Sequence, residues 1–229
     1  MKFKKIVSTL LTKYIKDDSL LSGITDVLHT AYTTNRLYHN TKHIEDLYNK
    51  SQSIKGTFID YELVCFAILF HDIIYDVNNT NTDINKTNEG LSAEYAVNFL
   101  NQYDIFKSDK RRLDKIRKMI IASRTHKLTD DSDINIFLDL DLSSLGSEYK
   151  VYEINSANIY LEYSLMDGFT DYKFNIGRMN FITSMLNRDT IFLTKQFRHL
   201  EKQARINLNS ELTLIQSKLR LNTNDNNNT

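Results

Sequence analysis

The chain has 229 residues, 41% of them hydrophobic, which is enough to bury a sizeable core within one helical domain. Lysine plus arginine and aspartate plus glutamate each total 29, which excludes a global charge excess that would draw the protein onto a nucleic acid polymer or an anionic membrane. The longest wholly apolar run, residues 63–70, is far shorter than the ~20 residues of a membrane span. We therefore expect one compact domain at residues 1–221 that binds no nucleic acid polymer and no membrane, followed by a polar, disordered tail at residues 222–229.

The N-terminal segment and the cysteine content both bear on the cellular compartment. The basic opening is like that of a signal peptide, but Lys13 and Lys16 interrupt the apolar stretch and no small-residue cleavage site follows. Cys65 is the single cysteine, so no intrachain disulfide can form. These features favour a reducing, cytoplasmic setting.

Apolar residues recur at helical spacing through most of the chain, whereas alternating, strand-like runs are scarce. Proline is absent and only 6 glycines occur, so the two strongest breakers of regular structure are rare. We therefore expect an all-α helical bundle. The predicted helices cover residues 2–15, 19–33, 41–54, 57–75, 87–103, 109–124, 147–165, 169–187 and 194–219. Polar segments at residues 77–90 and 127–133 are predicted surface loops.

His39 and His43 are four residues apart at the start of the third predicted helix. On a helix this spacing puts both rings on one face, as in zinc-site helices. Asn40 or Thr41 is a natural N-cap, however, which would leave His39 just outside the helix and His43 in its first turn. His43 is therefore the stronger candidate for a metal ligand, although exposed histidines at this spacing are also common.

The pair His71-Asp72 directly follows the apolar run 63–70, at the end of a predicted buried helix. Burying an unpaired carboxylate is costly, and the usual remedies are a salt bridge, a helix cap or a metal ion. Taken alone, the pair fits a satisfied histidine and a capping aspartate better than it fits a metal site.

Asp139 and Asp141 stand among apolar neighbours in the segment 136–146, where carboxylates are unexpected unless they have a partner. A site assembled from two histidines and two aspartates suits a divalent ion such as Mn, Fe, Co, Ni or Zn. Imidazole and carboxylate ligands together do not single out one metal.

The order His43, then His71-Asp72, then Asp141 resembles the H…HD…D signature of HD-superfamily phosphohydrolases. Several longer segments resemble the branch described as predicted metal-dependent HD phosphohydrolases, and they occur in the same order: RLYHNTKHIEDL, LFHDIIYDVNNT, NEGLSAEYA, IIASRTH, LDLDLSSLG and GRMNFITSMLNRDTIFLTKQF. The likeness covers about residues 32–212. It implies a single-domain, HD-type helical bundle that uses a divalent metal ion (Mn, Fe, Co, Ni, Zn or Mg) to hydrolyse a phosphoester of a nucleotide or another small phosphorylated metabolite.

The resemblance also implies roles for individual residues. The implied metal ligands are His43, His71, Asp72 and Asp141, with Asp139 as the substitute if the register is shifted by two residues. Some HD proteins hold a second metal with extra histidines, which makes His39 and His126 candidates for that role. Glu89 and Ser92 match the N-E-x-x-S-A motif of the branch and could support the ligands, although an ordinary helix start with an acidic first turn explains them at least as well.

An acidic pair follows the ligands by one helical turn in HD hydrolases of the HDxxED kind, and this chain has Tyr75 and Asp76 there. Asp76 would share a helix face with Asp72 and could orient or deprotonate the attacking water. Tyr75 departs from the motif, which leaves open whether the HDxxED mechanism applies here.

Cations and aromatic residues close in sequence to these ligands are candidates for substrate binding. The cations are Arg36, Lys42, Arg124 and Lys127. Arg36 and Arg124 are the preferred catalytic candidates, because the planar arginine fork suits phosphate better than lysine does. Tyr38 and Tyr75 could line a pocket for a nucleobase.

Two alternatives remain open from the sequence. One is a helical nucleotide-binding or regulatory protein that keeps the HD fold without catalysis, because Tyr75 replaces an acid. The other is a di-iron oxygenase of the HD type, in which His126 and His39 would hold a second iron. Helical HD proteins are often homodimers, but no residue of this chain requires it.

Overall fold

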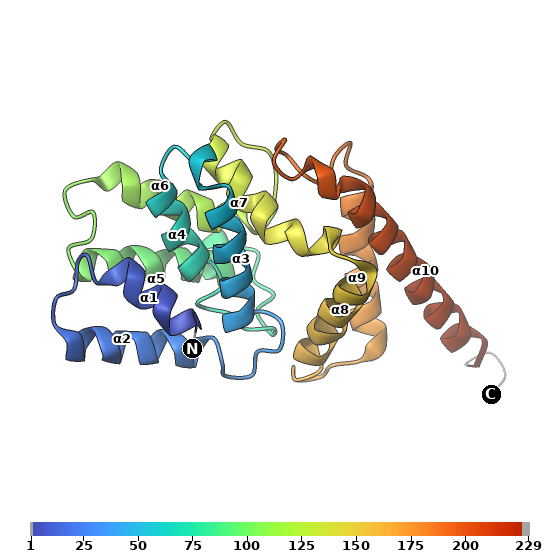
Figure 1. The fold of residues 1–229 in the computed structure, drawn as a ribbon. Coiled ribbons are helices and arrows are strands. Elements are labelled where there is room, and N and C mark those ends of the chain that lie inside the picture. The colour runs from blue at the N-terminus through green and yellow to red at the C-terminus, as the bar shows by residue number, and fades with distance from the viewer. Residues whose placement is uncertain (1, 226–229) are drawn as a thin grey trace. The chain divides into compact units, whose positions relative to one another are not determined.

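The computed structural model describes residues 2–225, and within them the side chains of residues 2–220. This part of the chain contains helices and no strand, which confirms the predicted all-α class (Figure 1). Its α-helices are α1 (Lys2–Leu11), α2 (Asp18–Ala31), α3 (Thr41–Ser53), α4 (Tyr61–Phe70), α5 (Asn88–Gln102), α6 (Lys110–Ala122), α7 (Ser132–Leu142), α8 (Tyr149–Tyr163), α9 (Asp171–Leu186) and α10 (Glu201–Asp225). None of these described helices has both the length and the apolar character needed to span a membrane.

The chain divides into two compact units, Met1–Asp141 and Leu142–Thr229, where the sequence led us to expect one domain over residues 1–221. The boundary falls at the end of α7. The first unit therefore contains α1 to α6 and nearly all of α7, and the second contains α8 to α10. Every residue for which the sequence predicts a role in a site belongs to the first unit.

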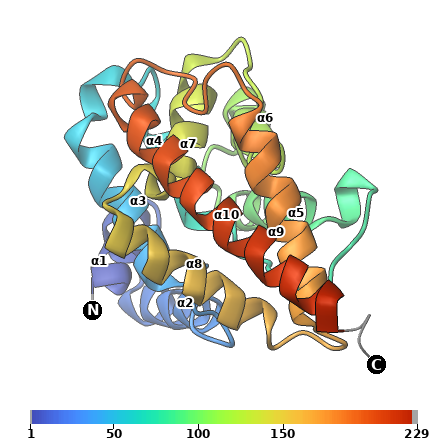
Figure 2. The same cartoon turned by 90° about the vertical axis from the view of Figure 1, so that its right-hand side faces the viewer.

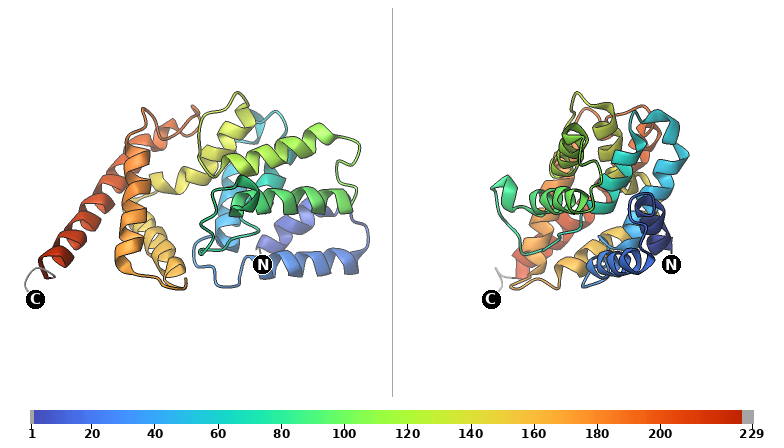
Figure 3. Two further views of the ribbon diagram at one scale, coloured as in Figure 1. Left: turned by 180° about the vertical axis from the view of Figure 1, so that it is seen from behind. Right: turned by 90° about the vertical axis from the view of Figure 1, so that its left-hand side faces the viewer.

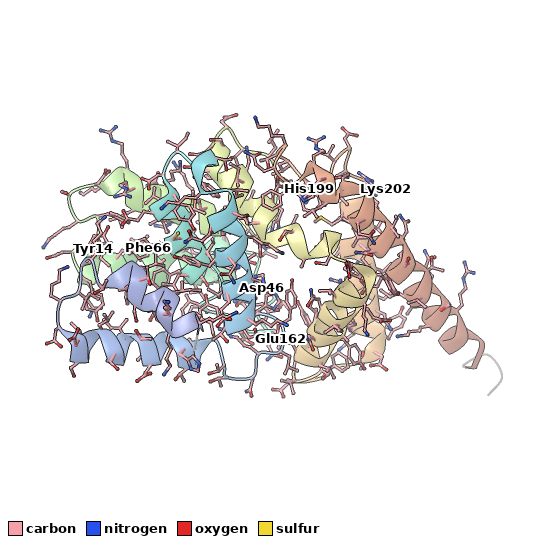
Figure 4. All side chains as sticks on the ribbon, in the orientation of Figure 1. Tyr14, Asp46, Phe66, Glu162, His199 and Lys202 are labelled. Atoms are coloured by element: carbon pink, nitrogen blue, oxygen red, sulfur yellow. The ribbon has the colours of Figure 1, made fainter. Side chains whose placement is uncertain are left out.

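The central helix of the first unit is α4. Its residues from Leu63 to Phe70 are all buried, and a helix that is apolar on every side must be surrounded by other elements. It packs against α1, α3, α5 and α6, and α5 and α6 lie side by side (Figure 3). The rings of Tyr14 and Phe66 illustrate this packing, with centroids 6.3 Å apart (Figure 4). The C-terminal end of this core helix leads directly into His71 and Asp72.

Hydrogen bonds connect the start of α7 to the residues just before α4. Asp131 precedes α7, and its carboxylate accepts the N–H groups of Asp133 at 2.9 Å and Ile134 at 3.2 Å, as an N-cap does. Asp133 is fully buried, and its carboxylate accepts the N–H groups of Ile59 and Asp60 at 2.8 and 3.0 Å. These bonds fix α7 relative to the residues that begin α4.

The second unit is built on α8, α9 and α10 (Figure 2). Arg178 of α9 donates two bonds to the carboxylate of Glu211 on α10, at 2.9 and 3.0 Å. Tyr152 and Ser156 of α8 donate to the same carboxylate. One half-buried acidic group, Glu211, therefore joins all three helices.

Several predicted bounds differ from the observed ones. The sequence analysis missed α7 altogether, and α4 covers Tyr61–Phe70 instead of the predicted 57–75. α10 begins at Glu201, after a short 3-10 helix at Arg198–Leu200, and extends to Asp225. Its backbone thus includes residues 222–225 of the predicted tail, while residues 226–229 lie outside the described part of the chain.

Candidate metal centre

The beginning of α3 positions His43. Asn40 is the N-cap, and its side-chain oxygen accepts the N–H groups of Lys42 at 2.9 Å and His43 at 3.4 Å. His43 therefore lies in the first turn of α3, with 8% of its surface exposed. His39 lies before the helix, and its ring centroid is 6.1 Å from that of His43. The two rings therefore do not share a helix face. This is the arrangement expected if Asn40 is the N-cap.

The end of α4 positions His71 and sets the chemistry of its ring. The His71 N–H donates to the carbonyl of Ala67 at 2.9 Å, and ring atom Nδ1 lies 3.0 Å from the carbonyl oxygen of Ile68. A carbonyl only accepts, so Nδ1 carries a proton and a cation can bind this ring only at Nε2. Burial acts to lower the pKa of His71, but the facing carboxylates of Asp72 and Asp141 raise it well above the usual value, so a metal ion would displace a proton from Nε2. His71 is almost fully buried, and its Nε2 is therefore presented as a metal ligand.

The four predicted ligands come together from α3, the end of α4 and the end of α7. Asp72 Oδ2 lies 3.0 Å from Nε2 of His71 and 3.8 Å from Nε2 of His43. Asp141 Oδ1 lies 3.2 Å from Nε2 of His43 and 3.5 Å from Nε2 of His71. Ligands bound at ~2.0–2.2 Å to one tetrahedral ion would be separated by about 3–4 Å. The distances among His43, His71 and Asp72 fit a single divalent ion, and Asp141 lies beside both histidines.

A second observation tests whether these residues suit a metal. The Nε2 atoms of His43 and His71 are buried and have no hydrogen-bond partner among the described residues. A buried polar atom without a partner costs ~1–3 kcal/mol. One ligand atom from each of His43, His71 and Asp72 lies within 4.8 Å of the others. A cation at this point would satisfy both nitrogen atoms, so the donor set fits a metal ion.

The electrostatics keep both aspartates ionised. Burial by itself would raise the pKa of Asp72, but the facing ring of His71 holds that pKa below its usual value. Burial likewise acts to raise the pKa of Asp141, and contacts with His126, His43 and His71 lower it well below the usual value. Since a metal ligand must be deprotonated, the two carboxylates are already in the form that binds a cation.

His126 contacts the other oxygen of Asp141, with its Nε2 2.9 Å from Oδ2. It follows α6 with a φ of 48°, in the left-handed region, and its N–H donates to the carbonyl of Ala122 at 3.0 Å. The Asp141 carboxylate thus faces His43 and His71 with one oxygen and His126 with the other. His126 therefore contacts one of the candidate ligands, and its role with a second metal stays a prediction.

Asp139 is not in position to replace Asp141. Residues two apart on a helix point to different faces, and it is Asp141 that brings its carboxylate to His43 and His71. Asp139 is fully buried elsewhere on α7. Of the two aspartates, it is therefore Asp141 that remains the candidate ligand.

The predicted geometry of Asp76 is wrong. α4 ends at Phe70, so Asp76 does not lie one helical turn after Asp72 on a shared face. Asp76 is exposed, and its carboxylate accepts the backbone N–H of Asn78 at 2.8 Å. The catalytic role predicted for Asp76 therefore loses the arrangement on which it depended.

Side chains of α5 hold the turn that carries Asp72, and the sequence analysis recognised only part of this. Ser92 is fully buried; its Oγ accepts the N–H of Ile74 and donates to the Ile74 carbonyl, both at 3.1 Å. Asn88 binds the N–H and the carbonyl of Asp76, at 3.2 and 3.0 Å. Asn88 is the first residue of the N-E-x-x-S-A motif, so the motif could have indicated its role in holding this turn. Glu89 lies half-buried in the first turn of α5.

Of the two aromatic candidates, Tyr38 lies beside the proposed ligand His43, and Tyr75 lies against His39. The ring of Tyr38 is 5.3 Å from that of His43, and Tyr75 stacks on His39 with centroids 4.1 Å apart. The cations differ in their placement: Lys42, Arg124 and Lys127 are exposed, and Arg124 donates to the Asn81 carbonyl at 3.4 Å. Arg36 is half-buried, and its guanidinium contacts backbone carbonyls.

In comparisons with known proteins, no family model matches the sequence, and none of the curated proteins matches it. The functional interpretation therefore depends on the residues themselves and on the geometry of the cluster formed by His43, His71, Asp72 and Asp141.

Proposed function

We propose that the protein is a metal-dependent phosphohydrolase that cleaves a phosphoester of a nucleotide or another small phosphorylated metabolite. The observation that carries the proposal is the pair of buried Nε2 atoms on His43 and His71, which have no hydrogen-bond partner among the described residues and face two ionised aspartates. The order of these ligands along the chain, with its resemblance to HD phosphohydrolases, supports the reaction class. The single, buried Cys65 supports a reducing, cytoplasmic setting.

The protein's own groups have distinct tasks in this reaction. When bound, a divalent ion supplies a water of lowered pKa and polarises a phosphoryl oxygen. His71 is held in one tautomer and one orientation by the Ile68 carbonyl, and Asp141 is oriented by His126. Exposed cations of the first unit, such as Lys42 and Arg124, would attract the phosphate charge.

The test replaces one ligand and one matched surface residue. Asp72→Ala removes a carboxylate from the cluster, so we expect it to abolish both metal binding and phosphoester hydrolysis. Asp114→Ala is the control, because Asp114 is an exposed partner of Lys118 on α6. Metal content would be measured by mass spectrometry, and turnover with an aryl phosphate and a nucleotide panel under Mn, Co, Ni and Mg. An unchanged metal stoichiometry in Asp72→Ala would show that the site is wrong.

A di-iron oxygenase is the second candidate. Its support is the 2.9 Å contact between His126 and the outer oxygen of Asp141, because these two side chains would hold a second iron next to the first. Two irons per chain together with oxygen uptake would support this reading. Bound metal without turnover on the whole panel would instead favour a regulatory, nucleotide-binding protein.

A further inference from the structure

The segment of residues 71–76, here called the ligand turn, carries two of the four proposed ligands outside any helix. Backbone polar groups that leave a helix inside a protein need new partners. In the ligand turn, several of these partners are side chains from other parts of the first unit, which raises the question of which side chain sets the position of Asp72.

Arg36 binds the ligand turn on its carbonyl side. Its guanidinium donates to the carbonyl oxygen of Asp72 and, at 2.9 Å, to that of Ile73. The same group lies 3.4 Å from the carbonyl oxygen of His39, in the segment that leads into α3. Arg36 therefore connects the backbone of two ligand-bearing segments, one next to His43 and one that includes Asp72.

The guanidinium itself is held in place by aromatic rings. It lies 5.0 Å from the ring centroid of Tyr32 and 5.7 Å from that of Tyr75. Tyr32 is fully buried, and its hydroxyl donates to the carbonyl of Leu69 at 2.7 Å, near the end of α4. A planar fork that stacks on rings and donates two bonds at once is specific to arginine, and lysine cannot reproduce it.

Ser92 and Asn88 bind the opposite part of the ligand turn. Together they take up the N–H and carbonyl groups of Ile74 and Asp76. Arg36 binds the carbonyl of the proposed ligand Asp72 and that of the next residue, Ile73, whereas the α5 side chains bind the residues that follow.

We propose that Arg36 is a positioning residue of the metal centre, which fixes the backbone of Asp72 and Ile73 so that the Asp72 carboxylate stays beside His71 and His43. This assigns Arg36 to the ligand turn in place of the phosphate contact expected from the sequence. The proposal rests on the metal site of the proposed function but not on phosphoester hydrolysis.

The first test measures cobalt binding in variants of Arg36. Arg36→Gln should weaken Co²⁺ binding by ~10–100-fold, the usual effect of losing a group that orients a ligand. Arg36→Lys retains one donor and should fall between this variant and the wild type. Arg111→Gln is the matched control, because Arg111 is exposed on α6 and should leave the affinity unchanged. The absorption bands of bound Co²⁺ should also shift in Arg36→Gln, since they report ligand geometry.

The second test needs no metal. Amide hydrogen exchange of the apoprotein should become faster in the peptides that cover residues 71–76 of Arg36→Gln, and remain unchanged in α6. Unchanged exchange, cobalt affinity and cobalt spectrum, with a raised KM for substrate, would overturn the proposal and return Arg36 to substrate binding. If the wild type binds no metal, the proposed function fails, but the exchange experiment still decides whether Arg36 holds the ligand turn.

Discussion

Individual hydrogen bonds decide which atoms of this cluster can bind a cation. The bond between His71 Nδ1 and the Ile68 carbonyl leaves Nε2 free of a proton in the neutral ring, and the contact with His126 leaves only one Asp141 oxygen facing the histidines. Neither effect can be read from the sequence, because the residue types are the same whichever nitrogen or oxygen points inward. The structure thus adds orientation to side chains that the sequence named as candidate ligands and that the fold brings together.

His126 offers a prediction about a single side chain. We expect His126→Gln to lower the affinity for divalent metal by ~10–100-fold, because Asp141 would lose the ring that orients it. His199→Gln is the control, since His199 is exposed in the second unit (Figure 4). Titration with Mn²⁺ or Co²⁺ measures the effect. If the affinities of variant and wild type agree, His126 does not orient Asp141.

Helix ends explain what the sequence could and could not predict about the elements. The buried run of α4 was recognisable because it is apolar on every side, but its end was placed at residue 75 instead of Phe70. Apolar residues continue through Ile73 and Ile74, so local periodicity contains no stop signal. The helix ends there because Arg36 and Ser92, both distant in sequence, bind the backbone of the following residues.

α7 was missed for a related reason. Its residues from Ile134 to Leu142 are apolar apart from Asn135 and the two aspartates, so they show neither the one-sided pattern of a surface helix nor a clear strand pattern. The start signal, Asp131 as N-cap, lies in a segment predicted to be a loop. A helix buried on several sides cannot be recognised by amphipathic periodicity alone.

The acidic group that joins α8, α9 and α10 leads to a prediction about pH. Burial acts to raise the pKa of Glu211, but Arg178 outweighs it with the help of Ser156 and Tyr152, and the pKa is lowered. A carboxyl whose pKa is lower in the folded state contributes stability fully above its usual pKa, and this is lost as the pH falls through the folded value.

Glu211→Gln should therefore destabilise the protein near pH 7, by ~3–5 kcal/mol, because it leaves Arg178 buried without its anionic partner. The difference from the wild type should narrow as the pH falls below about 4.5, the usual value for this carboxyl. Urea unfolding at a series of pH values measures both effects. Glu153→Gln, an exposed position on α8, should show no such trend, and a constant gap for Glu211→Gln would contradict the assignment.

For the molecule as a whole, the all-α fold class could be predicted from the sequence, but the division of the chain into two compact units could not. Helical periodicity and the scarcity of breakers were sufficient for an all-α protein. The boundary after Asp141, however, falls at the end of α7 with no linker composition to mark it, so nothing in the residue pattern indicated two units.

Metal binding should also be visible in the stability of the whole chain. A ligand that binds only the folded state stabilises it by ~2.7 kcal/mol at a free concentration of ~100 times its Kd. For a chain of this size, this corresponds to a rise in Tm of ~5–10 °C. We expect Co²⁺ to produce this rise in the wild type and in Asp114→Ala, and none in Asp72→Ala. Equal shifts in all three proteins would place the ion elsewhere.

The spread of the ligands along the chain, from His43 to Asp141, has a consequence for the order of events during folding. Any two of the three ligand-bearing segments lack part of the proposed site. We therefore expect tight metal binding only after α3, α4 and α7 have all packed together. Long-range contacts of this kind form after local helices, because closing a long loop costs chain entropy. The appearance of cobalt absorption in a rapid-mixing refolding experiment would therefore time the completion of the first unit.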